Sequence, residues 1–187
     1  MNIPNTLTLF RFLLVPVFLA FLLNGLIMQA LVTFIMAGVT DALDGAVARM
    51  TNSITEIGAI LDPLADKALV LTALIALTAM GRLSIWLTLV VLVRDIVVVT
   101  GGFIIYKRRY KVKVRPVLAG KLATFMLLSI LVLTLLGIYW GREFSFVPYL
   151  AWITAPLVII SGTQYVMKGI RIAKENRIPG LSGGTPS

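Results

Sequence analysis

Residues 117–140 read VLAGKLATFMLLSILVLTLLGIYW, a run whose single charged residue is Lys121. A helix that crosses the hydrocarbon core of a bilayer needs about 20 mainly apolar residues. This run is long enough and apolar enough, so it predicts a membrane-spanning helix.

Five further apolar runs lie near residues 7–23, 28–48, 57–80, 83–106 and 147–168. Apolar residues make up 59% of the chain, above the roughly 45–50% of soluble domains. The sequence therefore predicts an all-α fold, an integral membrane bundle of six transmembrane helices formed by one domain, residues 1–175. Residues 176–187 are rich in Gly, Ser and Pro, so we expect a disordered tail.

Basic residues gather on one side of the predicted bundle. Those that follow the fourth and sixth runs are Lys107, Arg108, Arg109, Lys111, Lys113, Arg115, Lys168, Arg171, Lys174 and Arg177. The opposite side carries only Arg82 and Arg142. The positive-inside rule therefore predicts that both termini are cytoplasmic. Because such residues favour anionic headgroups, we expect membrane lipids and no nucleic acid as partners of this chain, whose net charge is +9.

Carboxylates are concentrated in two short segments, DALDGAVAR at 41–49 and GAILDPLAD at 58–66. The chain has no cysteine and no histidine, so acid, base or metal chemistry falls to carboxylates. At about 100° per residue, Asp41 and Asp44 share one helical stripe, and Asp62 and Asp66 lie one turn apart. The short connection makes the two predicted helices antiparallel neighbours, so the two acidic rows can face each other.

Four carboxylates held this closely repel each other, by about 4 kcal/mol for a pair at 4 Å and an effective dielectric of 20. A cluster of oxygen ligands without His or Cys suits Mg²⁺ or Mn²⁺, and four carboxylates can hold two such ions. An alternative interpretation places these acids in headgroup water and gives the small residues a packing role only. The complete pattern favours the metal site.

The pattern D-x-x-D-G-x-x-A-R, followed after eight residues by G-x-x-x-D-x-x-x-D, resembles the signature of the CDP-alcohol phosphatidyltransferases at every fixed position. The opening Pro4-Asn5-x-x-Thr8-x-x-Arg11 extends the resemblance. It implies a phospholipid-synthesis enzyme with a six-helix core that transfers the phosphatidyl group of CDP-diacylglycerol to an alcohol and releases CMP. It also implies a homodimer in a bacterial cell membrane, with the active site facing the cytoplasm.

The resemblance assigns a role to each matching residue. The metal ligands, for two Mg²⁺ or Mn²⁺ ions, would be Asp41, Asp44, Asp62 and Asp66, with Asp66 also the catalytic base. The CDP-binding residues would be Asn5, Gly45, Ala48, Arg49, Thr55 and Gly58.

Three basic residues give a hypothesis for the acceptor alcohol. Arg94, Arg115 and Lys121 are predicted to lie near one cytoplasmic level, where they could form a pocket for a phosphate. The alternative is that Arg94 pairs with another side chain while Arg115 and Lys121 extend to headgroups. The start of the fifth run, with Gly120 and Thr124, resembles family members that use glycerol 3-phosphate.

Two features weaken this acceptor assignment. Ala123 and Leu127 stand where those members often carry Lys and Gln, and Arg94-Asp95 also resembles members that make cardiolipin from phosphatidylglycerol. Glycerol 3-phosphate is the favoured acceptor, followed by phosphatidylglycerol and then an inositol phosphate. A small ion transporter, the rival from another class, would place its polar groups near the membrane midplane, whereas these acids cluster at one face.

Overall fold

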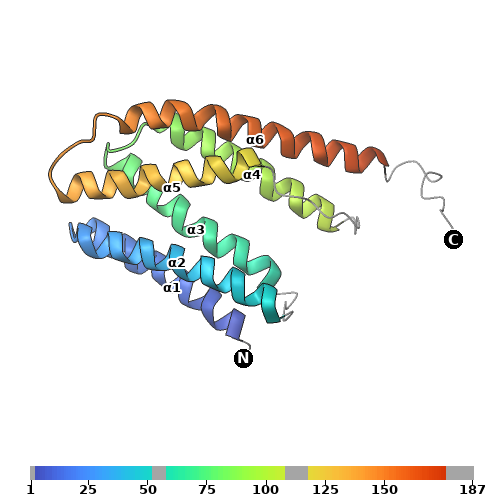
Figure 1. The fold of residues 1–187 in the computed structure, drawn as a ribbon, viewed down its shortest axis with the longest axis horizontal. Helices are drawn as coiled ribbons and strands as arrows, with labels where there is room; N and C mark the ends of the chain where they lie inside the picture. Colours follow the sequence, from blue (N-terminus) through green and yellow to red (C-terminus); the bar gives the residue numbers. More distant parts are fainter. Residues whose placement is uncertain (1–2, 52–57, 108–117, 176–187) are drawn as a thin grey trace. The chain divides into compact units, whose positions relative to one another are not determined.

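The computed structural model describes the backbone of residues 3–51, 58–107 and 118–175, and the side chains of residues 12–40, 67–101 and 118–171. Over these residues the secondary structure is α-helical, with no strand (Figure 1). The helices are α1 (Ile3–Leu23), α2 (Ile27–Thr51), α3 (Gly58–Ala79), α4 (Ile85–Lys107), α5 (Leu118–Tyr139) and α6 (Val147–Glu175). The all-α class and the six predicted helices are confirmed.

The helix boundaries depart from the predicted ones at the two ends of the bundle. Helix α1 begins at Ile3, before the predicted start at 7, and α6 continues to Glu175, beyond the predicted end at 168. Apolar runs stop where charged residues begin, but a helix does not have to stop there. Basic residues near the end of α6 interact favourably with the helix dipole, so the helix continues into the charged segment.

Helices α1, α3 and α5 end in the same backbone turn. Each is followed by a glycine with a positive φ, namely Gly25 (73°), Gly81 (71°) and Gly141 (62°). The residue after the glycine donates its N–H back to the last turn, as in the 2.9 Å bond from Arg82 N to Leu77 O. Glycine adopts this left-handed conformation without the strain that a side chain would bring, so each helix stops sharply and the chain reverses.

The helices form two compact units. The first unit comprises residues 1–85 and 128–147, and the second comprises residues 86–127 and 148–187. In the first unit, α1 packs against both α2 and α3. Phe18 of α1 meets Phe34 of α2 with their ring centroids 5.8 Å apart, and both rings are buried, as is Leu74 of α3. Interdigitating apolar side chains therefore hold the first unit together.

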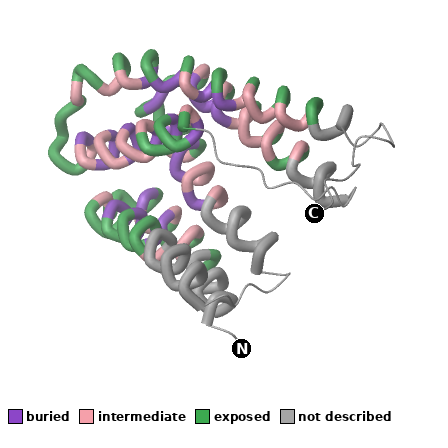
Figure 2. The backbone as a smooth tube through the Cα atoms, turned by 45° about the vertical axis from the view of Figure 1, so that its right-hand side comes forward, coloured by how far each residue is buried: buried purple, intermediate pink, exposed green. Residues whose placement is uncertain are grey.

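The second unit contains α4, the beginning of α5, and α6. Its inward faces carry Leu87 and Val91 on α4 and Ala155 and Val158 on α6, which are buried (Figure 2). The rings of Trp86 and Trp152 also meet across α4 and α6, with centroids 4.8 Å apart. Both buried rows follow helical spacing, and the next inward positions along them are Arg94 and Ser161.

Much of the exposed surface is apolar. Side chains such as Leu89 and Val93 on α4 or Ile153 and Met167 on α6 are more than half exposed. Over the described residues, two helical segments are long and apolar enough to cross a membrane, Leu118–Tyr139 and Val147–Arg171. Apolar surface of this extent is typical of a protein surrounded by lipid. The six crossings and the cytoplasmic termini stay predictions.

Candidate functional site

The four aspartates of the sequence pattern lie on two consecutive helices of the first unit. Asp41 and Asp44 belong to the second half of α2, and Asp62 and Asp66 belong to the first three turns of α3. The expected helical spacing within each pair is therefore present in the backbone. The side chains of residues 41–66 lie outside the described part of the chain, so the predicted metal site stays a prediction.

The chemistry of this donor set suits a hard divalent cation. Each carboxylate supplies oxygen ligands, which Mg²⁺ and Mn²⁺ prefer, and no soft ligand competes because the chain lacks cysteine. Among the side chains at 12–40, 67–101 and 118–171, no group of three or more acidic residues comes together. The residues of α2 and α3 therefore fit two divalent ions by composition and by helical spacing.

Most residues predicted to bind CDP belong to the same end of the first unit. Gly45, Ala48 and Arg49 lie in α2, Gly58 begins α3, and Asn5 lies in the first turn of α1. Figure 1 shows the start of α1 beside the end of α2 and the start of α3. Their side chains, and Thr55 as a whole, lie outside the described residues. The backbone thus gathers these segments at the end of the unit that carries the aspartates.

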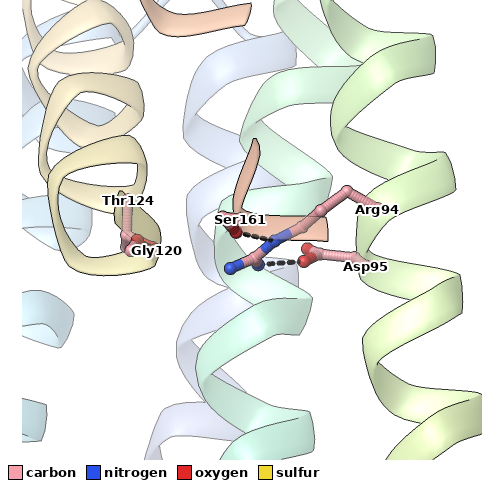
Figure 3. A network of polar contacts seen from close by, with 5 residues as sticks. All are labelled: Arg94, Asp95, Gly120, Thr124 and Ser161. Atoms are coloured by element: carbon pink, nitrogen blue, oxygen red, sulfur yellow. Dashed lines mark hydrogen bonds and ion pairs between the residues drawn. The ribbon is translucent and has the colours of Figure 1, made fainter. Parts of the chain in front are cut away.

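Arg94 is the centre of a polar cluster in the second unit (Figure 3). Its Nη1 donates to Asp95 Oδ1 at 2.6 Å, and its Nε donates to Ser161 Oγ at 3.2 Å. Only 16% of the Arg94 side chain and 13% of the Asp95 side chain are exposed. The guanidinium carbon lies 6.0 Å from the centroid of the Tyr165 ring, a distance that permits a cation–π attraction. Residues from α4 and α6 therefore hold this cation in place.

Two glycines let the helices approach Arg94 closely. A Cβ at Gly162 of α6 would lie 3.4 Å from Arg94 Cγ, and one at Gly120 of α5 would lie 3.5 Å from Arg94 Nη2. The same Cβ at Gly120 would lie 3.6 Å from Ser161 Oγ. The arginine stem therefore passes over the backbone of α6, and its guanidinium lies beside the first turn of α5. Small residues at a close helix contact are typical of membrane helices.

The predicted acceptor residues have different surroundings. Arg94 is partly buried, Lys121 is exposed on the first turn of α5, and Arg115 lies outside the described residues. Arg94 does pair with a side chain, as the alternative interpretation expected, but an arginine has five N–H donors and the two bonds engage two of them. The cluster therefore retains donors for an anion.

Ser161, Gly162 and Tyr165 were not among the sequence-predicted site residues. Their common signal in the sequence is a polar interruption, SGTQY at 161–165, within the apolar sixth run. A polar group in a membrane helix is a functional hint by default. Helical spacing would have placed Ser161 and Tyr165 on one face, but only the fold places Arg94 against that face.

A known protein family matches most of this chain. The family model for CDP-alcohol phosphatidyltransferases matches residues 1–160 of this chain. The chain belongs to the CDP-alcohol phosphatidyltransferase family. It is therefore an enzyme of phospholipid synthesis, and the ion-transporter alternative is set aside. Members of this family use divalent metals for catalysis, which agrees with the carboxylates carried by α2 and α3.

Similar proteins of this family occur in several bacteria. A CDP-diacylglycerol–glycerol-3-phosphate 3-phosphatidyltransferase of Aquifex aeolicus is 34% identical over 92% of this chain and 98% of the relative. A probable phosphatidylglycerophosphate synthase of Mycobacterium tuberculosis is 34% identical over 91% of this chain and 82% of its own length. A CMP-forming cardiolipin synthase of Streptomyces coelicolor is 33% identical over 93% of this chain and 85% of its own length.

Proposed function

We propose that this enzyme transfers the phosphatidyl group of CDP-diacylglycerol to glycerol 3-phosphate and releases CMP. The observation that carries the proposal is the presence of two aspartates on α2 and two on α3, at adjoining ends of consecutive helices. The relative from Aquifex aeolicus, which is named for transfer to glycerol 3-phosphate and aligns with 92% of this chain, supports this acceptor.

In the proposed reaction, Asp41, Asp44, Asp62 and Asp66 hold two Mg²⁺ or Mn²⁺ ions. The bound ions supply positive charge that stabilises the phosphoryl oxygens during displacement. Asp66 accepts the proton of the acceptor hydroxyl while that oxygen forms a bond to the lipid-bearing phosphorus. The bond from this phosphorus to the oxygen of the CMP phosphate breaks, and CMP leaves.

The nucleotide is held by the glycine-rich faces of the first unit. Gly45, Ala48 and Gly58 lack bulky side chains, so the pyrophosphate and cytidine can approach the backbone of α2 and α3 closely. Arg49 supplies a guanidinium for a phosphate, and Asn5 and Thr55 complete the CDP site. Phosphoryl transfer requires mainly positioning and charge stabilisation, which these groups provide.

The phosphate of the acceptor binds Arg94, together with Arg115 and Lys121. The bonds from Arg94 to Asp95 and Ser161 support this role, because they fix the guanidinium in one orientation before the anion arrives. A fixed, partly buried guanidinium binds an anion more strongly than a mobile one exposed to water, since less rotational freedom is lost.

The lipid substrate sets the location. Its acyl chains remain in the bilayer, so the six helices would cross a bacterial cell membrane, with both termini and the active site on the cytoplasmic side. The enzyme would act as a homodimer, as the family resemblance implies. The large exposed apolar surface of α4 and α6 supports a lipid environment.

Cardiolipin synthesis from phosphatidylglycerol is a second candidate. The relative from Streptomyces coelicolor and the Arg94-Asp95 pair both favour it. The deciding experiment is CMP release by the purified full chain in detergent, with CDP-diacylglycerol, Mg²⁺ or Mn²⁺, and glycerol 3-phosphate, phosphatidylglycerol or inositol phosphate as the acceptor. Release that requires glycerol 3-phosphate supports the first proposal. Release only with phosphatidylglycerol supports the second, and release only with inositol phosphate overturns both.

A further inference from the structure

Gln164 of α6 has a buried side-chain oxygen that no other described residue binds. Its Oε1 is buried and has no hydrogen-bond partner within the part of the chain that the structure describes. An amide oxygen accepts hydrogen bonds and cannot donate them. Leaving such an acceptor buried and unpaired is unfavourable, so in a native protein its presence calls for an explanation.

Gln164 lies on the face of α6 that receives Arg94. It follows Ser161 by three positions and precedes Tyr165 by one, and residues three or four positions apart on a helix are neighbours. Thr163, Val166 and Met167, on the other side of the helix, are exposed. Gln164 is about 4.5 Å further along the α6 axis than Ser161, toward the end of the helix that carries basic residues.

A cation and a neutral acceptor on adjacent turns match a phosphorylated polyol. The guanidinium of Arg94 attracts a phosphate, whereas the Gln164 oxygen needs a donor, and in glycerol 3-phosphate the donors are its two hydroxyl groups. One hydroxyl is consumed by the proposed transfer, and the other requires a partner when it leaves water. The unpaired Gln164 oxygen can therefore accept the hydrogen bond that the non-reacting hydroxyl of the ligand would donate.

We infer that Gln164 recognises the acceptor alcohol by accepting a hydrogen bond from its non-reacting hydroxyl at Oε1. This inference rests on the proposed function and adds a specificity-determining residue to it. A site built to hydrogen-bond a hydroxyl discriminates against an analogue that lacks it, because the buried oxygen is then left unpaired. Gln164 thus favours glycerol 3-phosphate over phosphorylated alcohols without a second hydroxyl.

The test combines a substrate change with a side-chain change. 3-Hydroxypropyl phosphate keeps the phosphate and a primary hydroxyl of glycerol 3-phosphate but lacks the secondary hydroxyl. For wild type we expect kcat/KM to be higher with glycerol 3-phosphate by about tenfold or more. Gln164→Met keeps the length of the side chain and removes the oxygen, so the two acceptors should become equivalent within about threefold. Thr163→Val, on the exposed face of the same helix, should keep the wild-type preference.

Each other outcome overturns the inference. A Gln164→Met variant that keeps the full preference would show that Oε1 does not bind the hydroxyl. An equal loss of kcat/KM with both acceptors would indicate that Gln164 has a structural role only. A second variant, Gln164→Leu, should show the same loss of preference as Gln164→Met, and thermal unfolding in detergent checks that it is folded. A wild-type enzyme inactive with glycerol 3-phosphate but active with phosphatidylglycerol would overturn the proposed function itself, and the inference with it.

Discussion

Arg94 lies about 13 Å along α4 from its first residue, well inside a helix that is about 34 Å long. We predict that α4 crosses the membrane, and at this depth of a membrane helix an arginine is unfavourable by about 2.5–3.5 kcal/mol on insertion scales. Asp95 compensates the charge, and Ser161 satisfies a further donor. These two bonds to a partly buried guanidinium indicate that Arg94 has a role that an apolar residue could not fill.

Arg94→Lys tests that role. A lysine ammonium lacks the planar fork, so it cannot keep the bonds to Asp95 and Ser161 and also present donors to a phosphate. We expect the KM for glycerol 3-phosphate to rise about tenfold or more while the KM for CDP-diacylglycerol stays unchanged, as measured by CMP release. Arg82→Lys is the control, because Arg82 pairs with the 85% exposed Glu143 at 3.0 Å. Equal effects of the two variants would contradict the role of Arg94.

Gly137 and Gly38 are two helical positions at which an alanine substitution tests how closely the backbone is packed. A Cβ at Gly137 would lie 2.7 Å from the carbonyl oxygen of Arg142, whereas a Cβ at Gly38 would meet nothing within 4 Å. The Arg142 backbone cannot move away easily because its N–H bonds Gly137 O at 2.9 Å. Gly137→Ala should therefore lower the free energy of unfolding by about 1–3 kcal/mol. Gly38→Ala should leave it equal or slightly higher, because alanine favours a helix.

Thermal unfolding of the purified protein in detergent measures both effects. A Gly137→Ala variant that unfolds at the wild-type temperature would show that the end of α5 adjusts to the added methyl group. At this scale the sequence identified Arg94 and Gly120 but not their partners. Nothing along the chain links Arg94 to Ser161, since the fold alone brings α4 and α6 together.

Helices are the level at which the sequence was most informative. An apolar run has a length that the bilayer sets, so six runs predicted six helices, and all six form over the described residues. Their ends were less predictable. The hydropathy signal stops near Lys168, but backbone hydrogen bonding continues α6 to Glu175. The aspartate pattern was also evident because the spacing of a helix fixes which residues share a face.

Substitutions of the aspartates on α2 and α3 should produce two different defects, one in turnover alone and one that includes metal binding. Asp66→Asn should keep binding of Mg²⁺ and CDP-diacylglycerol but reduce turnover by about 10²–10⁴-fold, because an amide cannot accept the proton. Asp41→Asn and Asp62→Asn should weaken metal binding as well, seen as a higher Mg²⁺ concentration for half-maximal CMP release. Glu143→Gln is the control for a lost acid, since Glu143 is exposed between α5 and α6. Wild-type turnover in Asp66→Asn would exclude it as the base.

Removal of the divalent ions tests the same helices without mutation. A chelator should abolish CMP release, and added Mg²⁺ or Mn²⁺ should restore it, because the acidic cluster cannot by itself stabilise the charge of the transferred group. Ca²⁺, a larger ion with a looser coordination shell, should restore it poorly. Full activity in the chelator would contradict a metal role for the aspartates.

At the scale of the whole molecule, the chain forms two compact units, each made of segments distant in the sequence. Helix α5 contributes its first part to one unit and its last part to the other. No local signal predicts such a division, because it depends on which helices pack together. The family signature predicted the chemistry without any knowledge of this division into units, because the signature lies within α2, α3 and their connection.

The charge distribution predicts the orientation of the molecule in the membrane. If the chain crosses the membrane six times, the turn at Asn24 and the segment at Glu143 should face outward, and the C-terminus should face the cytoplasm. The chain lacks cysteine, so a single introduced cysteine reports one position. A membrane-impermeant maleimide should label Asn24→Cys and Glu143→Cys in intact cells but should label Ser187→Cys only after lysis.

The reverse labelling pattern would place the aspartates of α2 and α3 on the outer face, away from cytoplasmic nucleotide. Labelling of all three positions in intact cells would indicate an even number of crossings between Glu143 and Ser187, and would contradict a single crossing by α6. The reverse orientation would also put on the outer face the ten basic residues that follow the fourth and sixth apolar runs. We therefore expect the orientation that keeps these residues in the cytoplasm.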